Sequence, residues 1–382
     1  MLLPEDHSNA GAVSFEGASD RKSSAAGAVL ELDGVVRRYG GTTALDRVSL
    51  TLAGNEYVSL LGPSGSGKTV LLRVIAGFEE PDAGAILFKG RSIAGVPAHK
   101  RGIGFVFQNF ALFPHLSVYD NIAFGLTNRA DRPITDKAKV RKTVRDMVEL
   151  VGLAGLENRG VHQISGGQRQ RVALARTLVA EPNLVLLDEP LGALDANLRN
   201  RMRGELRRIR EKLAVTFLHV TGSESEALAI GDRVVVLDNG HVGQFDRPDE
   251  IYNRPANPNV ARFLNCYNIF SGTVADGRFA SAAGIFPVTR LRKTSTGPAY
   301  AIRRDLVAIR PAGQERGPGQ AGVESVFLAS EYSGSAITYF FELAGGQVVE
   351  VENHLSHRKP EELSPKASYS LIWSVDDAVV FA

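Results

Sequence analysis

The chain has 382 residues, which is too long for one compact domain and predicts two or three. Its residues are 44% hydrophobic, enough for real cores, and a net charge of +2 gives no argument for nucleic acid as the main partner. The single cysteine, Cys266, excludes an internal disulfide framework and fits a reducing compartment, and no stretch approaches the roughly 18 apolar residues of a membrane-spanning helix.

The N-terminal part predicts an extension followed by a strand and a helix. Residues 1–27 are rich in Ser, Ala, Gly, Asp and Glu and lack the apolar core of a signal peptide, which predicts disorder. Residues 56–62 (EYVSLLG) form a short apolar run typical of a strand. Residues 68–77 (KTVLLRVIAG) predict a helix. Its apolar face consists of Val70, Leu71, Val74 and Ile75.

Between this strand and helix, residues 62–69 read GPSGSGKT, which fits the phosphate-binding pattern G-x-x-x-x-G-K-[ST]. Glycine lets the backbone turn so that successive N–H groups point at phosphate oxygens, and the helix N-terminus adds its positive end. Lys68 then reaches the β- and γ-phosphates, and the Thr69 hydroxyl ligates Mg²⁺. The alternative, a plain Gly/Ser turn between strand and helix, does not explain why Lys and Thr stand at the start of the helix. The predicted nucleotide-binding residues here are Gly62, Pro63, Ser64, Gly65, Ser66, Gly67, Lys68, Thr69 and Val70.

The middle of the chain, roughly residues 115–180, predicts helices. One amphipathic stripe with helical spacing consists of Val140, Val144, Met147, Val148 and Val151. A second such stripe follows at 198–213 (LRNRMRGELRRIREKL), where the arginines between the apolar positions predict a solvated face rather than a membrane surface. The apolar positions of this second stripe are Leu198, Met202, Leu206, Ile209 and Leu213.

Two adjacent carboxylates follow a buried strand at 183–190 (NLVLLDEP). The continuous apolar run before them is typical of a parallel strand buried on both faces. Asp188 stands at the carboxyl end of that strand, where ligands bind in open α/β sheets, and can hold Mg²⁺ through water. Glu189 is placed to polarise an attacking water. The alternative, a surface Asp-Glu pair before a proline turn, does not explain the buried run.

Residues 164–171 read ISGGQRQR and open a predicted helix at 167–180. Ser165, Gly166, Gly167 and Gln168 resemble the signature motif of ABC transporter ATPases, and the order of the three motifs supports this resemblance. Two glycines at a helix N-terminus form a second phosphate-binding nest. The resemblance implies that this nest caps the γ-phosphate of ATP held on an opposing subunit, so that the active site is complete only in a dimer.

Four further positions follow from this resemblance. Tyr39, in RRYGG before the first predicted β-hairpin, matches the aromatic residue that stacks on adenine, with a strand-surface tyrosine as the alternative. Gln108 matches the glutamine that contacts Mg²⁺ and water and senses the γ-phosphate. Asp195 matches the aspartate of the D-loop, which communicates across the dimer. The segment 108–126 matches the region that meets a coupling helix of the permease, although some of its side chains also suit a helical core.

One family position departs from the pattern. Family members carry a switch histidine after the strand that follows the D-loop helix, and here the ungapped frame of 214–234 places Gly222 there. His219 is three residues earlier, which is about 10 Å along an extended strand and on the opposite face. We therefore interpret His219 as a strand residue. Without the histidine, we expect ATP to bind but to be hydrolysed slowly.

The texture of the sequence changes after 250–265 (EIYNRPANPNVARFLN). Short β-type runs divided by Gly, Pro and charged turns follow, and they resemble the TOBE-type barrel of importer ATPases from the polyamine, iron and sugar groups. The predicted fold is an α/β P-loop ABC ATPase with a RecA-like core, a helical subdomain and an N-terminal antiparallel β part, followed by a small all-β OB/TOBE-type barrel. The predicted domains are 28–264, with the helical subdomain at about 115–180, and 265–382.

The resemblance implies the ATPase subunit of a bacterial ABC importer that uses ATP and Mg²⁺ at the cytoplasmic face of the inner membrane. Its expected partners are a second ATPase copy, membrane permease subunits and, indirectly, an extracytoplasmic solute-binding protein. Phrases such as GFEEPDAG and LSVYDNIAFGL point first to spermidine/putrescine uptake, but iron(III) and sugar relatives share them. A DNA-repair or translation ATPase would need coiled-coil insertions or tandem cassettes, which this chain lacks. A weakly hydrolysing regulatory subunit remains the alternative because of Gly222.

Overall fold

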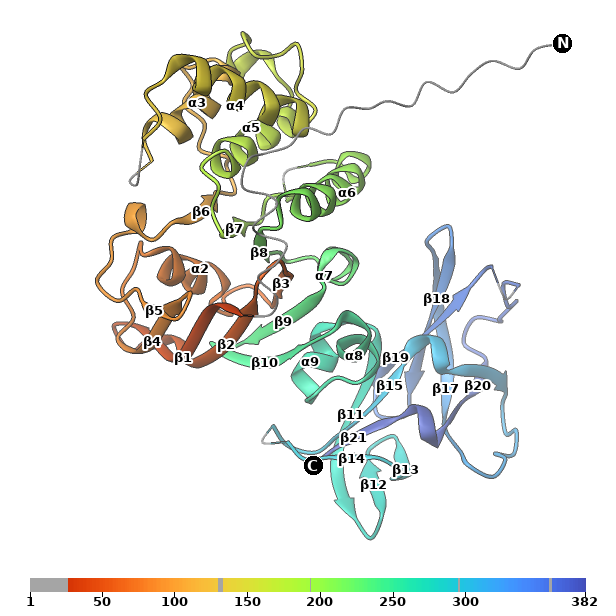
Figure 1. Cartoon of the computed structure of the whole chain (residues 1–382). Coiled ribbons are helices and arrows are strands. Elements are labelled where there is room, and N and C mark those ends of the chain that lie inside the picture. Colours follow the sequence, from red (N-terminus) through yellow and green to blue (C-terminus); the bar gives the residue numbers. More distant parts are fainter. Residues whose placement is uncertain (1–26, 130–132, 193, 295, 357–358) are drawn as a thin grey trace, which may run out of the picture. The chain divides into compact units, whose positions relative to one another are not determined.

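A computed structural model describes residues 27–129, 133–192, 194–294, 296–356 and 359–382 (Figure 1). The predicted disordered extension lies outside the described residues except for Gly27. The chain divides into two compact units, one ending at Val242 and one beginning at Gly243. Each unit has its own hydrophobic core and is described by itself below.

A six-stranded sheet in the order β10-β9-β3-β8-β7-β6 organises the first unit. The pairs β9–β3, β3–β8, β8–β7 and β7–β6 are all parallel. The predicted strand at 56–62 is β3, and every one of its residues is buried, as expected for a strand covered on both faces. The strands are β3 (Tyr57–Leu61), β6 (Ile103–Val106), β7 (Leu184–Asp188), β8 (Thr216–Val220), β9 (Arg233–Asp238) and β10 (His241–Asp246).

A second, antiparallel sheet in the order β2-β1-β4-β5 forms the N-terminal β part of the same unit. Long strands β1 and β2 are joined by the tight Gly40-Gly41 turn, where Tyr39 pairs with Thr42. The strands are β1 (Ala28–Tyr39), β2 (Thr42–Ala53), β4 (Ala83–Phe88) and β5 (Arg91–Ser92). Helix α2 (Lys68–Ala76) packs against β2, β6 and β7, so it connects the two sheets.

The predicted helical subdomain contains three helices, of which α3 packs on both others (Figure 1). They are α3 (Val118–Thr127), α4 (Lys137–Leu150) and α5 (Gly166–Leu178). The amphipathic stripe predicted for α4 is confirmed, since all five of its apolar residues are buried. Two more helices, α6 (Ala196–Leu213) and α7 (Glu224–Ile230), precede and follow β8 along the chain. Short 3₁₀ turns lie at Ala98–Lys100 and Val161–Gln163.

Helix α6 buries Met202, Leu206 and Ile209 as predicted, and its arginines lie on the exposed or half-buried side, but several of them also bond to neighbouring segments. Arg210 donates two hydrogen bonds to Asp232, at 2.8 and 3.1 Å, and another to the carbonyl of Asn55. Other α6 arginines donate to backbone carbonyls: Arg199 to Leu194, Arg207 to Ala229 and Arg208 to Leu150. These arginines therefore connect α6 to neighbouring segments, which periodicity alone does not reveal.

The second unit is built mainly from two sheets, β13-β12-β11-β15-β21-β14 and β16-β20-β17-β18-β19. An aromatic cluster fills its core: the indole N–H of Trp373 donates to the hydroxyl of Tyr300 at 2.9 Å, and Phe270 stacks on Trp373. The strands are β11 (Tyr267–Ala275), β12 (Arg278–Ser281), β13 (Gly284–Pro287), β14 (Leu291–Arg292), β15 (Ala299–Arg303), β16 (Ala308–Pro311), β17 (Gln320–Tyr332), β18 (Ala336–Leu343), β19 (Val348–His354), β20 (Ser368–Ser374) and β21 (Val379–Phe381). Short 3₁₀ turns lie at Arg304–Leu306 and Val375–Asp377.

Helices α8 (Pro248–Asn253) and α9 (Pro258–Phe263) belong to this second compact unit, whereas the sequence groups them with the first domain. They are tied to the strands by polar contacts: Arg292 donates to the carbonyls of Arg254 and Pro255, and Tyr267 donates to the carbonyl of Tyr252. Within the described residues, no helix is long and apolar enough to cross a membrane.

Candidate nucleotide-binding site

The GPSGSGKT loop leaves β3 at its carboxyl end and leads into α2. Lys68, the first residue of α2, folds back over the loop, and its Nζ donates to the carbonyls of Gly62 and Pro63, each at 2.8 Å. The residue is only 8% exposed. Burial lowers the pKa of the Lys68 ammonium, while the carboxylates of Glu189 and Asp188 oppose this effect. The loop therefore holds one cation beside two anions.

Two glycines of the loop have no room for a side chain. A Cβ at Gly62 would lie 2.2 Å from the carbonyl oxygen of Leu237, and one at Gly67 would lie 2.5 Å from that of Ala44. Gly67 also has a φ of 99°, in the region that favours glycine. The loop therefore lies close against β2 and β9 at these two glycines. The N–H groups at the start of α2 are positioned to bind a phosphate.

Asp188 ends β7 next to the loop. Burial, followed by the nearby Glu189 carboxylate, raises the pKa of the Asp188 carboxyl, while the Arg73 guanidinium and the Thr69 hydroxyl oppose this shift. A divalent cation at this position would offset that raised pKa by stabilising the charged carboxylate. The structure thus joins two of the predicted Mg²⁺ residues, although their motifs are far apart in the sequence.

Glu189 and Gln108 also meet here, because β7 and β6 are neighbouring parallel strands. The side-chain amide of Gln108 donates to Oε2 of Glu189 at 3.0 Å. Glu189 has a φ of 44°, a strained value for a non-glycine residue, and its backbone N–H donates to the carbonyl of Val220 in β8. Strain of this kind persists where the surroundings over-determine the backbone, so the Glu189 carboxylate is held in a defined position.

The signature residues stand at the N-terminus of α5. Ser165 accepts from the N–H of Gln168 at 3.3 Å, and the Gln168 side chain accepts from the N–H of Ser165 at 2.8 Å, which forms a capping box. Ser165 is exposed, while Gly167 packs beside Leu198. Within the described residues, no hydrogen bond joins this helix start to the Lys68 loop. Asp195 likewise caps α6 by accepting from the N–H of Leu198.

Tyr39 lies inside the β1–β2 hairpin rather than before it, and its ring is 43% exposed. The guanidinium of Arg37 lies 4.8 Å from the ring centroid, and the Tyr39 hydroxyl donates to Glu79. One ring face is therefore occupied by a cation, which leaves the other face for a stacking partner.

Gly222 follows β8 and is exposed, two residues after Val220 and thus near the backbone contact to Glu189. A Cβ at Gly222 would meet no atom within 4 Å. His219 is fully buried in β8: its Nδ1 is 2.9 Å from the Tyr57 hydroxyl and its Nε2 is 2.9 Å from the Glu226 carboxylate. Burial is the largest influence on Glu226 and would raise its pKa, but His219, with smaller contributions from Thr221 and Arg203, lowers the pKa overall. The interpretation of His219 as a strand residue is confirmed.

Sequence reasoning missed Arg176 of α5. Its guanidinium donates to the carbonyls of Ala111 at 2.8 Å and Phe110 at 3.1 Å, and it lies 5.2 Å from the centroid of the Phe113 ring. Phe110 and Ala111 have φ values of 64° and 44°. Arg176 thus holds the strained turn that follows Gln108 and joins it to the helix of the signature motif. The dihedrals that create these carbonyl acceptors leave no mark in the sequence.

Because the loop, its lysine and the two carboxylates meet at the carboxyl edge of one parallel sheet, the first unit is a P-loop nucleotide-binding domain. Residues 45–192 match the family model described as ABC transporter, and residues 301–381 match the model described as TOBE domain.

Relatives extend this match over most of the chain. An uncharacterised ABC transporter ATP-binding protein of Escherichia coli, YdcT, is 38% identical over 91% of this chain and 96% of its own length. The spermidine/putrescine import ATP-binding protein PotA of Nitrosospira multiformis is 42% identical over 85% of this chain and 90% of its own. The sulfate/thiosulfate import ATP-binding protein CysA of Caulobacter vibrioides is 45% identical over 74% of this chain and 82% of its own.

A solved dimeric ATP-binding cassette in a post-hydrolysis state, bound to ADP and Pi, superposes with a TM-score of 0.52 at 30% identity, covering 57% of this chain and 98% of that one. The chain belongs to the ATP-binding proteins of ABC transporters. It is an importer ATPase that binds ATP and couples its hydrolysis to transport. The predicted fold class is confirmed in both parts, the P-loop cassette and the TOBE barrel.

Proposed function

We propose that two copies bind ATP head to tail, with Lys68 and Glu189 of one copy facing Ser165 and Gly167 of the other. The observation that carries this proposal is the Glu189 carboxylate, which is fixed by Gln108 beside the phosphate-binding loop. Ser165 is exposed at the N-terminus of α5, and no hydrogen bond between described residues joins it to the phosphate-binding loop of its own copy. In the proposed dimer, the start of α5 in the second copy completes the phosphate site of the first, and the reverse.

We assign the side chains the roles that the family resemblance implies. Lys68 neutralises the β- and γ-phosphates, and Glu189 polarises the attacking water. Gln108 orients that carboxylate and senses the γ-phosphate, and Tyr39 offers the free face of its ring to adenine. Asp195, at the cap of α6, communicates across the dimer.

The proposed Mg²⁺ site consists of Thr69, Asp188 and Gln108. The described residues hold no cluster of three or more His, Cys, Asp or Glu that could bind a metal on its own. This fits Mg²⁺, which is usually bound by one or two carboxylates together with substrate phosphates and water. The Thr69 hydroxyl lies close enough to Asp188 to affect the pKa of its carboxyl, so two oxygen ligands are available near this position. When bound, the ion would neutralise charge that develops on the phosphates.

The Glu189→Gln variant tests this arrangement. It should bind ATP with unchanged affinity and accumulate as an ATP-bound dimer, because the shape is kept while the water loses its polarising group. Size-exclusion chromatography with ATP and Mg²⁺ is the measurement, and Glu211→Gln, an exposed change on α6, is the matched control. Monomers alone at saturating ATP would contradict the head-to-tail dimer.

For the permease contact we propose the segment 108–126, at the cytoplasmic face of the inner membrane. Phe113 packs on Phe124 with ring centroids 4.5 Å apart, and Phe124 is 39% exposed on α3. Arg176 fixes this aromatic pair to α5. A permease helix that presses on the segment would therefore act on Gln108 and on the signature helix together.

The solute we propose is a polyamine of the spermidine/putrescine type. The polyamine importer relative matches 85% of this chain, but the sulfate/thiosulfate importer relative is also similar, at 45% identity over 74%. We expect spermidine or putrescine to stimulate ATP hydrolysis when the chain is reconstituted with the permease and the solute-binding protein that neighbouring genes encode. Sulfate, iron(III) and sugars are the comparison solutes. Stimulation by a comparison solute alone would reject the polyamine assignment while leaving the ATPase role intact.

A weakly hydrolysing regulatory subunit is the second candidate. Gly222 favours it, because the position after β8 offers no side chain toward Glu189. This candidate keeps ATP binding and dimer formation but predicts little turnover by the isolated chain.

A further inference from the structure

The outer face of helix α4 is strongly basic, and its charged groups form no ion pair with other residues in the described part of the chain. Its inner side packs Val140, Val144 and Met147 into the core. Five cations lie on its exposed side within nine positions. None of the five forms an ion pair or side-chain hydrogen bond with another described residue. This α4 basic face consists of Lys137, Lys139, Arg141, Lys142 and Arg145.

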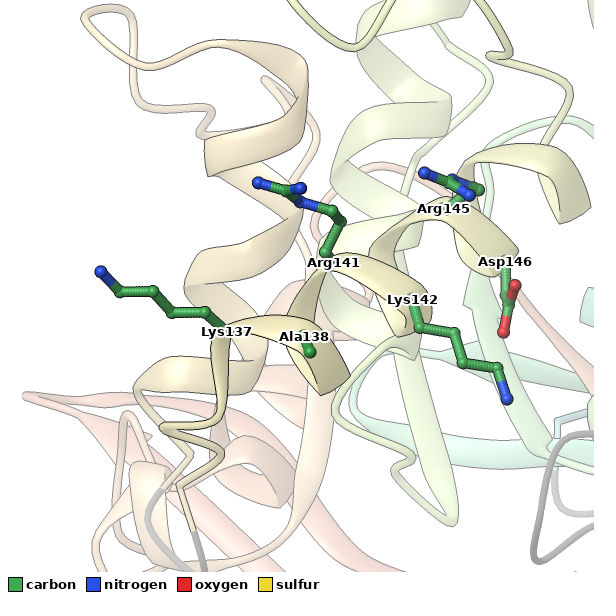
Figure 2. A pocket seen from close by; sticks show the side chains of 6 residues that line it. All are labelled: Lys137, Ala138, Arg141, Lys142, Arg145 and Asp146. Carbon is green, nitrogen blue, oxygen red and sulfur yellow. The ribbon is translucent and has the colours of Figure 1, made fainter.

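The placement of these cations costs helix stability. Lys137 and Lys139 stand in the first turn, where the helix dipole disfavours positive charge, and the last turn of α4 contains no basic residue. Lys137, Arg141 and Arg145 are spaced four residues apart and lie in a row along the helix, where like charges repel (Figure 2). The carboxylate of Asp136, which caps the N–H groups of Ala138 and Lys139, offsets only part of this positive charge.

The arginines of α6 provide a contrast within the same unit. Arg199, Arg208 and Arg210 all donate hydrogen bonds to neighbouring segments, so their charges serve the fold. The α4 cations serve no such contact. Local choices that oppose stability are expected at sites that meet a partner.

The surface around the α4 basic face is hollowed. One hollow of about 560 Å³ is lined by four cations, Lys137, Arg141, Lys142 and Arg145, and by Ala138 and Asp146, whose side chains Figure 2 shows. A second, of about 470 Å³, is lined by Arg141 and Arg145 together with Tyr119 of α3, Glu157 and Asn158. The two hollows share both arginines. They offer clustered guanidinium groups, the side chains best suited to a phosphate.

We propose that the α4 basic face binds the anionic headgroups of membrane phospholipids. Tyr119 belongs to the segment 108–126, so the second hollow adjoins the surface that we assign to the permease. This inference rests on the proposed function, because a chain docked on a membrane-embedded permease brings that surface near headgroups. Phosphodiester groups supply negative charge to five cations that form no ion pair with any other residue in the described part of the chain.

The test is flotation of the full chain with phosphatidylcholine vesicles that contain or lack phosphatidylglycerol. The wild type should float with the anionic vesicles and be released by high salt, which screens exposed charges. The variant Lys137→Gln/Arg141→Gln/Lys142→Gln should partition roughly 100-fold more weakly, because each cation near an anionic surface contributes about fivefold. Its melting temperature should be unchanged or higher, since repulsion along α4 is relieved.

The matched control removes three exposed cations elsewhere in the first unit, by Arg91→Gln/Arg201→Gln/Lys212→Gln. It should float like the wild type. Equal loss in both triple variants, or equal flotation with neutral vesicles, would overturn the proposal. So would an α4 variant that floats normally but loses binding to the detergent-solubilised permease, which would assign the face to an acidic protein segment. ATP-dependent dimers of Glu189→Gln, measured separately, report on the proposed function alone.

Discussion

The Lys68→Ala variant should lose tight ATP binding, with a dissociation constant raised by roughly 100-fold or more. Lys68 is the cation of the phosphate-binding loop that can reach the β- and γ-phosphates, and charge-assisted hydrogen bonds of this kind contribute about 1.5–3 kcal/mol each. Two such bonds correspond to at least a 100-fold change in affinity. Equilibrium binding of a fluorescent ATP analogue is the measurement.

The same lysine also holds its own loop, through the carbonyls of Gly62 and Pro63. Thermal melting of the variant without nucleotide separates that role from phosphate binding, and Lys68→Met keeps the length of the side chain. Lys100→Ala, an exposed change in the same unit, is the control for loss of charge. Unchanged ATP affinity in both Lys68 variants would refute the assignment of the loop.

Local sequence patterns predicted the parts of this fold that depend on neighbouring residues. The run 56–62 became β3 and the run 183–190 became β7, because a continuous apolar strand is stable only when both faces are covered. The helical stripe of 137–150 likewise found its core. In α2 the match was less complete, since Leu72 is buried and Val70 only half-buried.

Contacts between distant segments were beyond the sequence alone. The strand pattern predicts the position of Glu189 and the resemblance that of Gln108, but their hydrogen bond depends on β6 pairing with β7. Periodicity predicts a solvated arginine face on α6, but it does not show which backbone carbonyls these arginines reach. The grouping of α8 and α9 with the barrel depends on side chains such as Arg292, far along the chain.

We predict that Gly222 slows the hydrolysis of ATP without affecting its binding. Gly222 lies outside the phosphate-binding loop, so we expect ATP binding to be preserved. In the family that this chain resembles, a histidine at this place bonds the γ-phosphate and helps to hold the catalytic glutamate and the water. His219 does not replace it, because both of its ring nitrogens face Tyr57 and Glu226 in the core. Gly222 offers only its backbone N–H.

The Gly222→His variant should therefore hydrolyse ATP on the order of 100-fold faster than the native chain, which is the scale of one transition-state contact. The structure accepts the change, since a Cβ at Gly222 meets no atom within 4 Å and the residue does not adopt a positive φ. Steady-state release of phosphate is the measurement. Gly204→His on α6, where a Cβ also meets open space, is the matched control and should leave the rate unchanged.

Adding Glu189→Gln to Gly222→His should abolish the gain, because the histidine acts by holding a water that Glu189 must polarise. A native chain that is already fast, with no gain from the histidine, would show that another donor holds the γ-phosphate. A gain that survives Glu189→Gln would place the new histidine outside this mechanism. A slow native chain and a fast variant together would mean that the importer obtains its rate from a partner, either an ATPase subunit that carries the histidine or a permease that rearranges the site.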